Sequence, residues 1–273
     1  MRELAMSKRD DTSRDAWGEL EGARRHYLDL LARILTNNIF AVEPSDRSHN
    51  QSQFVEQFVR HYIKGPAFST LPLVRFENLR ACMVDVLRQN NAGDFIEAGV
   101  WRGGATIFMR ALLKSYGVAD RRVWVADSFD GLPEPDPEKF PLEAKTHRGP
   151  VMRKVYQHFT CDLDEVKNNF NTFGLLDEQV VFLKGWFKDT LAAAPIARLA
   201  VLRLDGDYYQ STTDGLLNLY NKVSVGGYVI IDDYAEDSWT YCRKAVNEFR
   251  RDQGISEPLM DVDAKCVYWQ KAQ

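Results

Sequence analysis

From residue 93 onward the chain alternates five short apolar runs with segments that can form helices, and this alternation limits the possible folds more than any other feature. The runs are almost continuously apolar, which is typical of strands buried on both faces. Strands that alternate with helices favour a parallel sheet with helices on both sides. The runs lie within DFIEAG, RVWVADSF, QVVFLKG, RLAVLRLDGD and GGYVIIDDY, and the helical segments span 103–116, 162–174, 211–222 and 238–252.

The remaining chain lies on either side of this pattern or inside its longest loop. Helical spacing of apolar residues over 16–40, 51–64 and 73–89 predicts an N-terminal helical layer. That layer either packs or dimerises, or it covers the substrate side of an active site. The C-terminal stretch EPLMDVDAKCVYWQKA predicts a hairpin that completes the sheet, and the long, Pro-rich, charged loop 128–160 is typical of a lid. We therefore divide the chain into a flexible tail over 1–15, a helical cap or oligomerisation segment over 16–90, and an α/β domain over 91–273.

Composition excludes several classes of protein. The 35 Lys and Arg against 39 Asp and Glu give a net charge of −4, so no basic surface for nucleic acid is expected. No apolar run approaches the roughly 20 residues of a membrane span, and the charged N-terminus does not resemble a secretory signal. The four cysteines form no CxxC pair, which argues against a zinc site and favours free thiols in a reducing cytoplasm. The histidines form no HExxH or Ser/His/Asp pattern, so a hydrolase is weakly supported.

The turn after the first apolar run is rich in glycine. Ligands of open parallel sheets bind at the carboxyl ends of the strands. Here the run ends at Glu97 and Gly99, and Gly103 opens the following helix, whose N-terminal amides can face a carboxylate or phosphate. The spacing E-x-G-x-x-x-G-G departs from G-x-G-x-x-G, which argues against a nicotinamide cofactor. Tight turns also need glycine for structural reasons alone.

Two further strand ends suit an adenosine. Asp127 closes the second run, where an acid can accept hydrogen bonds from a ribose diol. Gly185, Trp186 and Phe187 follow the third run, and two aromatic rings there suit a purine. Asp127 could instead cap a turn, and the aromatics could belong to the core. Together these features favour S-adenosylmethionine over ATP, which would require a G-x-x-x-x-G-K-[ST] loop.

Carboxylates gather at the last two strand ends. Asp205 and Asp207 follow the fourth run, and Asp232 and Asp233 follow the fifth. Converging carboxylates raise one another's pKa unless a cation is present, and Mg²⁺ prefers such oxygen ligands. A metal held by Asp205, Asp232 and Asp233 would activate a substrate hydroxyl, and Asp207 would serve as general base. Separate solvated aspartates, or Asp207 capping the helix from Ser211, remain the structural alternatives.

Beyond single motifs, residues 90–273 resemble the macrocin-type (TylF-like) sugar O-methyltransferases through IEAGVWRGGATIF, VWVADSFDGLP, FGLLDEQVVFLKGWFKDTL, LAVLRLDGDYYQST, GGYVIIDDY, CRKAVNEFR and VYWQK. The resemblance implies a class I methyltransferase fold with a Rossmann-like, mostly parallel seven-stranded sheet, S-adenosylmethionine and Mg²⁺. It assigns metal binding to Asp205, Asp232 and Asp233, and base catalysis to Asp207. It assigns the cofactor to Glu97, Ala98, Gly99, Val100, Arg102, Gly103, Ala105, Thr106, Asp127, Ser128, Gly185, Trp186, Phe187 and Asp205.

The resemblance implies methyl transfer to a hydroxyl of a deoxysugar on a glycosylated natural product. A catechol or phenol O-methyltransferase is the alternative enzyme, but its lysine base is missing, because Tyr208 stands three residues after Asp205. A non-catalytic binding protein that retains the fold is the second alternative. We expect a small-molecule glycoside as partner, no nucleic acid or membrane, a homodimer or larger homo-oligomer, and a cytoplasmic location.

Overall fold

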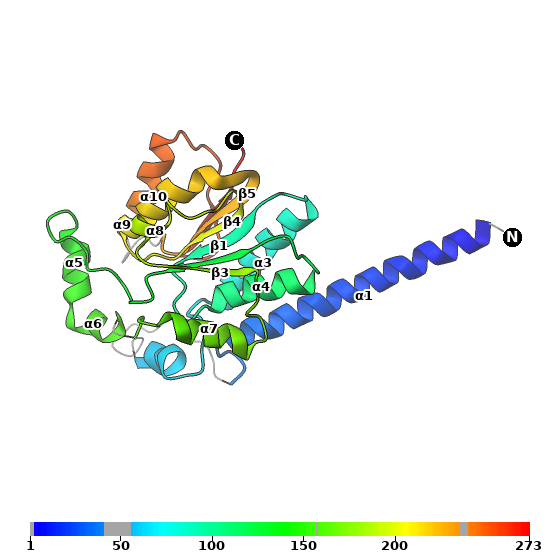
Figure 1. Cartoon of the computed structure of the whole chain (residues 1–273), viewed down its shortest axis with the longest axis horizontal. Helices are drawn as coiled ribbons and strands as arrows, with labels where there is room; N and C mark the ends of the chain where they lie inside the picture. Colours follow the sequence, from blue (N-terminus) through cyan, green and yellow to red (C-terminus); the bar gives the residue numbers. More distant parts are fainter. Residues whose placement is uncertain (1–2, 41–55, 157, 235–239) are drawn as a thin grey trace.

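A seven-stranded sheet forms the centre of the computed structural model, which describes residues 3–40, 56–156, 158–234 and 240–273 (Figure 1). The strand order is β3-β2-β1-β4-β5-β7-β6. Strands β1 to β5 are parallel, and β7 runs antiparallel to both β5 and β6. The predicted parallel sheet and its terminal hairpin are therefore confirmed. The strands are β1 Asp94–Ala98, β2 Val123–Asp127, β3 Val180–Lys184, β4 Leu199–Leu204, β5 Val223–Ile231, β6 Met260–Asp261 and β7 Val267–Gln270.

The register of the central strands aligns the carboxyl ends of β1, β4 and β5 with one another. Ala98 pairs with Leu204, and Leu204 pairs with Ile231. Asp205 directly follows Leu204, and Asp232 directly follows Ile231. The two aspartates therefore lie at the same edge of the sheet. Every residue of β4 is buried, as its apolar run predicts, and this includes Arg203, the one charged residue of the strand.

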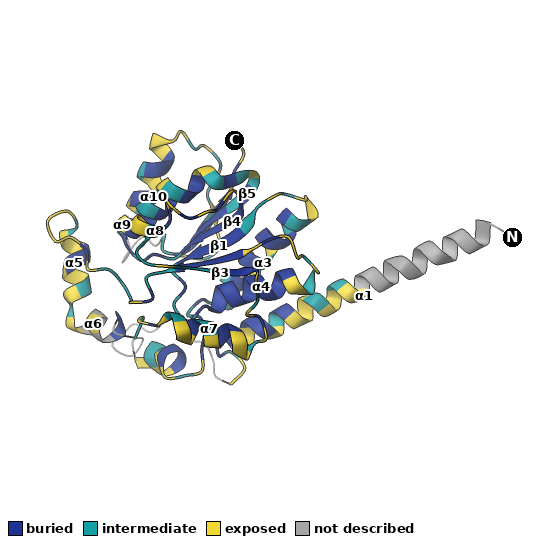
Figure 2. Ribbon diagram, viewed as in Figure 1, coloured by how far each residue is buried: buried dark blue, intermediate teal, exposed yellow. Residues whose placement is uncertain are grey.

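Helices cover both faces of the sheet, and the buried strands lie between them (Figure 2). One apolar core contains Leu28, Phe76 and Phe108, so it joins the N-terminal helices to one face. The other contains Leu216 and Phe249 and covers the opposite face. The helices are α1 Glu3–Leu35, η1 Val59–Ile63, α3 Leu73–Arg88, α4 Gly104–Ser115, α5 Pro141–Arg148, α6 Pro150–Tyr156, α7 Leu163–Thr172, α8 Phe187–Thr190, α9 Tyr209–Leu219, η2 Tyr220–Lys222 and α10 Thr240–Asp252.

Several element boundaries differ from the sequence-based expectation. Helix α1 begins at Glu3 instead of at residue 16, because residues 3–15 contain no proline or glycine to interrupt a helix. Residues 128–160 were expected to be a loop but contain α5 and α6, each of which begins at a proline. Part of the helix predicted over 51–64 and the first residues of that over 238–252 lie outside the described residues.

The structure also bears on the expected state of the cysteines and on membrane-spanning helices. Cys82, Cys161, Cys242 and Cys266 are all buried free thiols. Among the described residues, no helix combines the length and apolar character that crossing a bilayer requires.

Candidate active site

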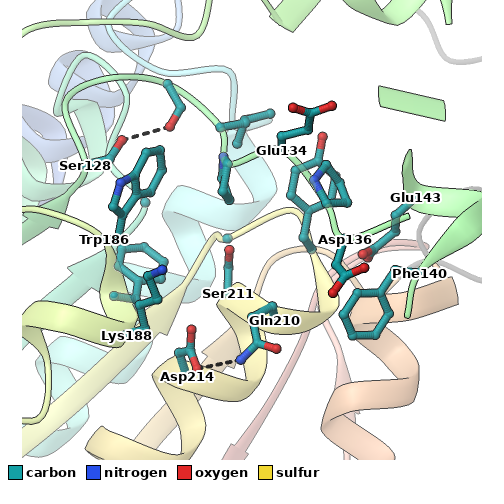
Figure 3. A pocket seen from close by; sticks show the side chains of 18 of the residues that line it. Ser128, Glu134, Asp136, Phe140, Glu143, Trp186, Lys188, Gln210, Ser211 and Asp214 are labelled. Carbon is teal, nitrogen blue, oxygen red and sulfur yellow. Dashed lines mark hydrogen bonds between the residues drawn. The ribbon is translucent and has the colours of Figure 1, made fainter. Parts of the chain in front are cut away.

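The carboxyl ends of the strands open into a cavity of about 490 Å³. Figure 3 shows Trp186 and Lys188 on one side of it and Phe140, Asp136 and Glu143 on the other. The first group follows β3, and the second belongs to the segment 128–160. Of the predicted cofactor residues, those that line this cavity are Gly99, Asp127, Ser128, Trp186, Phe187 and Asp205.

A second cavity of about 270 Å³ lies beside the first. Both are lined by Gly99, Asp127 and Asp205, so they meet at the ends of β1, β2 and β4. The second cavity contains the acidic groups of the last two strands and a set of aromatic rings that the sequence did not single out. Its acidic residues at the ends of β4 and β5 are Asp205, Asp207, Asp232 and Asp233, and its aromatic residues are Phe58, Trp101, Tyr156 and Phe159.

The aromatic rings form one connected group. Phe159 lies at its centre, with ring centroids 5.8 Å from Trp101, 6.4 Å from Phe58 and 6.4 Å from Tyr156. The indole Nε1 of Trp101 donates to the carbonyl of His158 at 3.0 Å, which fixes the ring against this segment. The second cavity therefore combines an apolar wall with carboxylates.

Gly99 is required by the close approach of β1 and β4. Its φ of +92° is unfavourable for other residues, and a Cβ atom there would lie 1.8 Å from the carbonyl oxygen of Asp205. The backbone of Asp205 is fixed from the same side, because its N–H donates to the carbonyl of Ala98 at 2.9 Å. The absence of a side chain at Gly99 thus allows the backbone of Asp205 to lie against the end of β1.

Asp127 organises the backbone around the first cavity. Its Oδ2 accepts the N–H of Val100 at 2.7 Å, and its Oδ1 accepts the N–H of Phe129 at 2.8 Å. Burial raises the pKa of this carboxyl group, and the two backbone bonds lower it in part. The alternative in which Asp127 caps a turn is therefore observed, and Asp127 also lines the first cavity.

Other predicted cofactor residues do not line the first cavity, and one of them supports the turn. Arg102 donates to the carbonyls of Tyr62, Ile63 and Ala67, with the shortest bond, to Ala67, at 2.8 Å. It therefore connects the turn to the N-terminal layer. The predicted residues that do not line the first cavity are Glu97, Ala98, Val100, Arg102, Gly103, Ala105, Thr106 and Gly185.

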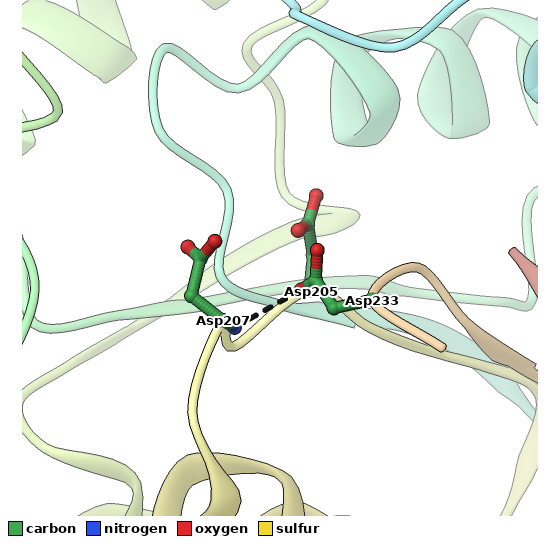
Figure 4. A group of neighbouring side chains, drawn as sticks. All are labelled: Asp205, Asp207 and Asp233. Atoms are coloured by element: carbon green, nitrogen blue, oxygen red, sulfur yellow. Dashed lines mark hydrogen bonds between the residues drawn. The ribbon is translucent and has the colours of Figure 1, made fainter. Parts of the chain in front are cut away.

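Three of the carboxylates form a group that could hold a cation. Asp205, Asp207 and Asp233 each offer an oxygen, and these oxygens all lie within 4.8 Å of one another (Figure 4). The N–H of Asp207 donates to Oδ2 of Asp233 at 3.0 Å, and Asp207 has the unusual φ of +60°. Backbone strain of this kind is frequent at functional sites.

The electrostatic state of these acids is consistent with a cation site. Burial, followed by the repulsion of neighbouring carboxylates, raises the pKa of Asp205 to about 6. The same two causes raise the pKa values of Asp207 and Asp233 well above the ordinary range of an aspartate. A divalent ion would remove this repulsion.

Asp232, the remaining predicted metal ligand, lies outside that group and bonds to two arginines. Its Oδ1 accepts from Arg203, and its Oδ2 accepts from Arg75 of α3 at 2.6 Å. Arg203 also donates to Glu97 and to Asp205, the latter at 3.0 Å. Only 1% of Arg203 is exposed, so these carboxylates compensate a charge that would otherwise be very unfavourable inside the sheet.

The family profile of Macrocin-O-methyltransferase (TylF) matches residues 65–271. A tetracenomycin-C rhamnosyl 4'-O-methyltransferase of Streptomyces olivaceus is 44% identical over 91% of this chain and 94% of its own length. Demethyldecarbamoylnovobiocin O-methyltransferase of Streptomyces niveus is also 44% identical, over 90% and 94%. Mycinamicin III 3''-O-methyltransferase of Micromonospora griseorubida is 42% identical, over 90% and 96%.

The fold agrees with these sequence relationships. The solved structure of the O-methyltransferase NovP is 42% identical in sequence and superimposes with a TM-score of 0.79, covering 92% of this chain and all of that chain. The calicheamicin methyltransferase CalS11 superimposes with a TM-score of 0.56 at 19% identity over 90% and 91% of the two chains, which supports the fold alone.

Proposed function

This chain belongs to the macrocin O-methyltransferase family, and from that premise we propose that it methylates a deoxysugar hydroxyl of a glycosylated natural product, with S-adenosylmethionine as methyl donor. The names of two relatives give different natural products as substrates, a rhamnosyl tetracenomycin and a mycinamicin. The sugar is therefore the feature of the acceptor that we carry over to this protein.

The observation that carries the proposal is the meeting of two cavities at the ends of the central strands. The larger one is lined by Gly99, Asp127 and the aromatic side chain of Trp186, which suits an adenosine. The smaller one contains Asp207 and Asp233, which suits a hydroxyl that must lose a proton. Since the cavities share Asp205, a methyl donor in one and an acceptor in the other would lie next to each other.

We propose that Asp205, Asp232 and Asp233 bind Mg²⁺. Two of these three residues, Asp205 and Asp233, belong to the group of carboxylate oxygens that lie within 4.8 Å of one another, and the raised pKa values of both fit a hard divalent cation. Asp232 differs from the other two, since both of its oxygens already accept from guanidinium groups, although each oxygen keeps a second lone pair. When bound, the ion supplies positive charge that makes a nearby hydroxyl more acidic.

Asp207 is the general base of this proposal. An aliphatic hydroxyl is a poor nucleophile until its proton is taken, and Asp207 lines the cavity in which the acceptor would bind. Its carboxylate would accept the hydroxyl proton as the hydroxyl oxygen bonds to the methyl carbon, while the bond between that carbon and the sulfur breaks and S-adenosylhomocysteine leaves. The two adjoining cavities would hold the reactants in contact and orient them, which supplies much of the rate increase.

Binding of the donor separates this enzyme from a non-catalytic protein that only retains the fold. We expect calorimetric titration with S-adenosylmethionine to show one binding event per chain, with ATP giving none, because the described residues include no phosphate-binding loop. Absence of heat with S-adenosylmethionine would support the non-catalytic alternative.

Two predictions concern the protein as a whole. A homo-oligomer stays a prediction, supported by α1, which exposes Leu20, Tyr27 and Leu30 on a helix that projects from the sheet (Figure 1). A second copy would cover these side chains. The cytoplasmic location also stays a prediction, supported by the four buried free thiols.

A further inference from the structure

Glu143 lies on the wall of the larger cavity opposite Trp186, in the first turn of α5 (Figure 3). Its helix belongs to the segment 128–160, which connects β2 to α7. Only 5% of Glu143 is exposed, which is unusual for a glutamate in a short helix at the surface.

The two oxygens of this carboxylate differ in their environment. Oε1 accepts the N–H of Tyr209 at 2.8 Å, which fastens α5 to the start of α9. Oε2 is buried and has no hydrogen-bond partner among the residues that the structure describes. A buried, unpaired carboxylate oxygen is unfavourable, and burial accordingly raises the pKa of Glu143 to about 7. This arrangement is what a residue awaiting a ligand would show.

The charged side chains that line the larger cavity favour a positively charged ligand. Its lining includes the acids Asp127, Glu134, Asp136, Glu143, Asp205 and Asp214, but only the lysines Lys139 and Lys188. Some of these acids already have partners: Glu134 accepts from Arg148 at 2.6 Å, and Asp214 accepts from Gln210 at 2.8 Å. Glu143 is different because its second oxygen is both buried and unpaired.

We propose that Glu143 is a cofactor-binding residue: its Oε2 pairs with an N–H donor or with the positive charge of S-adenosylmethionine. Because Oε1 holds Tyr209 at the same time, the bound cofactor, α5 and the start of α9 become one connected unit. Cofactor binding would thereby order the segment that closes the larger cavity. This inference rests on the proposed use of that cavity for S-adenosylmethionine.

The test is the affinity of Glu143→Gln for the cofactor. Glutamine keeps an oxygen that can accept the N–H of Tyr209, but it removes the charge and presents an N–H₂ group where the ligand would donate. We expect the dissociation constant of S-adenosylmethionine, measured by calorimetry, to rise about tenfold or more, as loss of a charged hydrogen bond does. Glu138→Gln is the matched control, since Glu138 is exposed in the same segment and does not line the cavity, and its affinity should equal that of the wild type.

Titration with S-adenosylhomocysteine identifies the group that Glu143 contacts. Weaker binding of both ligands to Glu143→Gln indicates an N–H donor common to them, whereas weaker binding of S-adenosylmethionine alone indicates the sulfonium charge. Unchanged affinity for both ligands overturns the inference. If the wild type binds neither ligand, the proposed function fails instead, so the two failures are distinguishable.

A second measurement needs no variant and therefore does not depend on the folding of Glu143→Gln. Hydrogen exchange of the wild-type amides in 141–148 should slow when S-adenosylmethionine is added, because the ligand supplies a partner for Oε2 of Glu143 and so stabilises α5. Exchange in α5 that stays the same at saturating cofactor would contradict the proposal.

Discussion

Replacement of Asp207 by asparagine is expected to lower kcat for methyl transfer by about 10²- to 10⁴-fold, the usual contribution of a general base. Asparagine has nearly the same shape, tolerates the φ of +60° at this position, and keeps the N–H that donates to Asp233. It cannot accept a proton at neutral pH. The loss should therefore appear in the chemical step, with the dissociation constant of S-adenosylmethionine unchanged.

The matched control for this variant is Asp189→Asn. Asp189 is exposed in α8 and lines neither cavity, so the same chemical change there should leave kcat at the wild-type value. Stopped assays of methyl transfer to a glycoside, with calorimetry of cofactor binding, give both quantities. Turnover near the wild-type rate in Asp207→Asn would remove Asp207 as the base.

Removal of divalent metal is expected to abolish activity, and added Mg²⁺ should restore it. The half-buried carboxylates of Asp205, Asp207 and Asp233 repel one another, so a cation is their natural partner. We also expect Mg²⁺ to raise the thermal unfolding temperature of the wild type but not of Asp233→Asn, which lacks one of the charged ligands. Activity after dialysis against chelator, and unfolding with and without Mg²⁺, measure these effects.

Asp232→Asn separates the two possible ligand sets. Because Asp232 is a predicted ligand, its replacement should weaken Mg²⁺ binding. If metal affinity is unchanged in this variant but lost in Asp207→Asn, the ion is held by the group that includes Asp207. Full turnover in excess chelator would contradict a metal-dependent reaction altogether, and Asp189→Asn again serves as the control for the loss of one charge.

The fold could be predicted because the sequence patterns that indicate its strands and helices are local. Each parallel strand is a short apolar run that ends at a polar or glycine residue, and the ends of parallel strands meet at one edge. This reasoning identified Gly99 and the acids after β4 and β5, which the structure brings to the same place. The interleaved helices were predicted from the segments between the apolar runs, which can form helices, and the N-terminal helices from apolar residues at helical spacing.

The missed features depend on contacts between distant parts of the chain. Glu143 is buried because α5 packs against the start of α9, 66 residues later, which no local pattern in 128–160 reveals. The aromatic wall combines Phe58 and Trp101 with residues from α6 and the loop that follows. One signal was available in the sequence: Arg203 interrupts an apolar run. A charge in a fully buried strand requires acidic partners, which here are Glu97, Asp205 and Asp232.

The most direct test of the central claim is the position of the transferred methyl group. The protein is incubated with Mg²⁺, S-adenosylmethionine labelled in its methyl group and a deoxysugar glycoside with a phenolic aglycone, and the product is fragmented in a mass spectrometer. We predict one labelled methyl group on the sugar fragment and none on the aglycone. Label on the phenol, or faster methylation of a simple catechol than of the glycoside, would contradict a sugar O-methyltransferase.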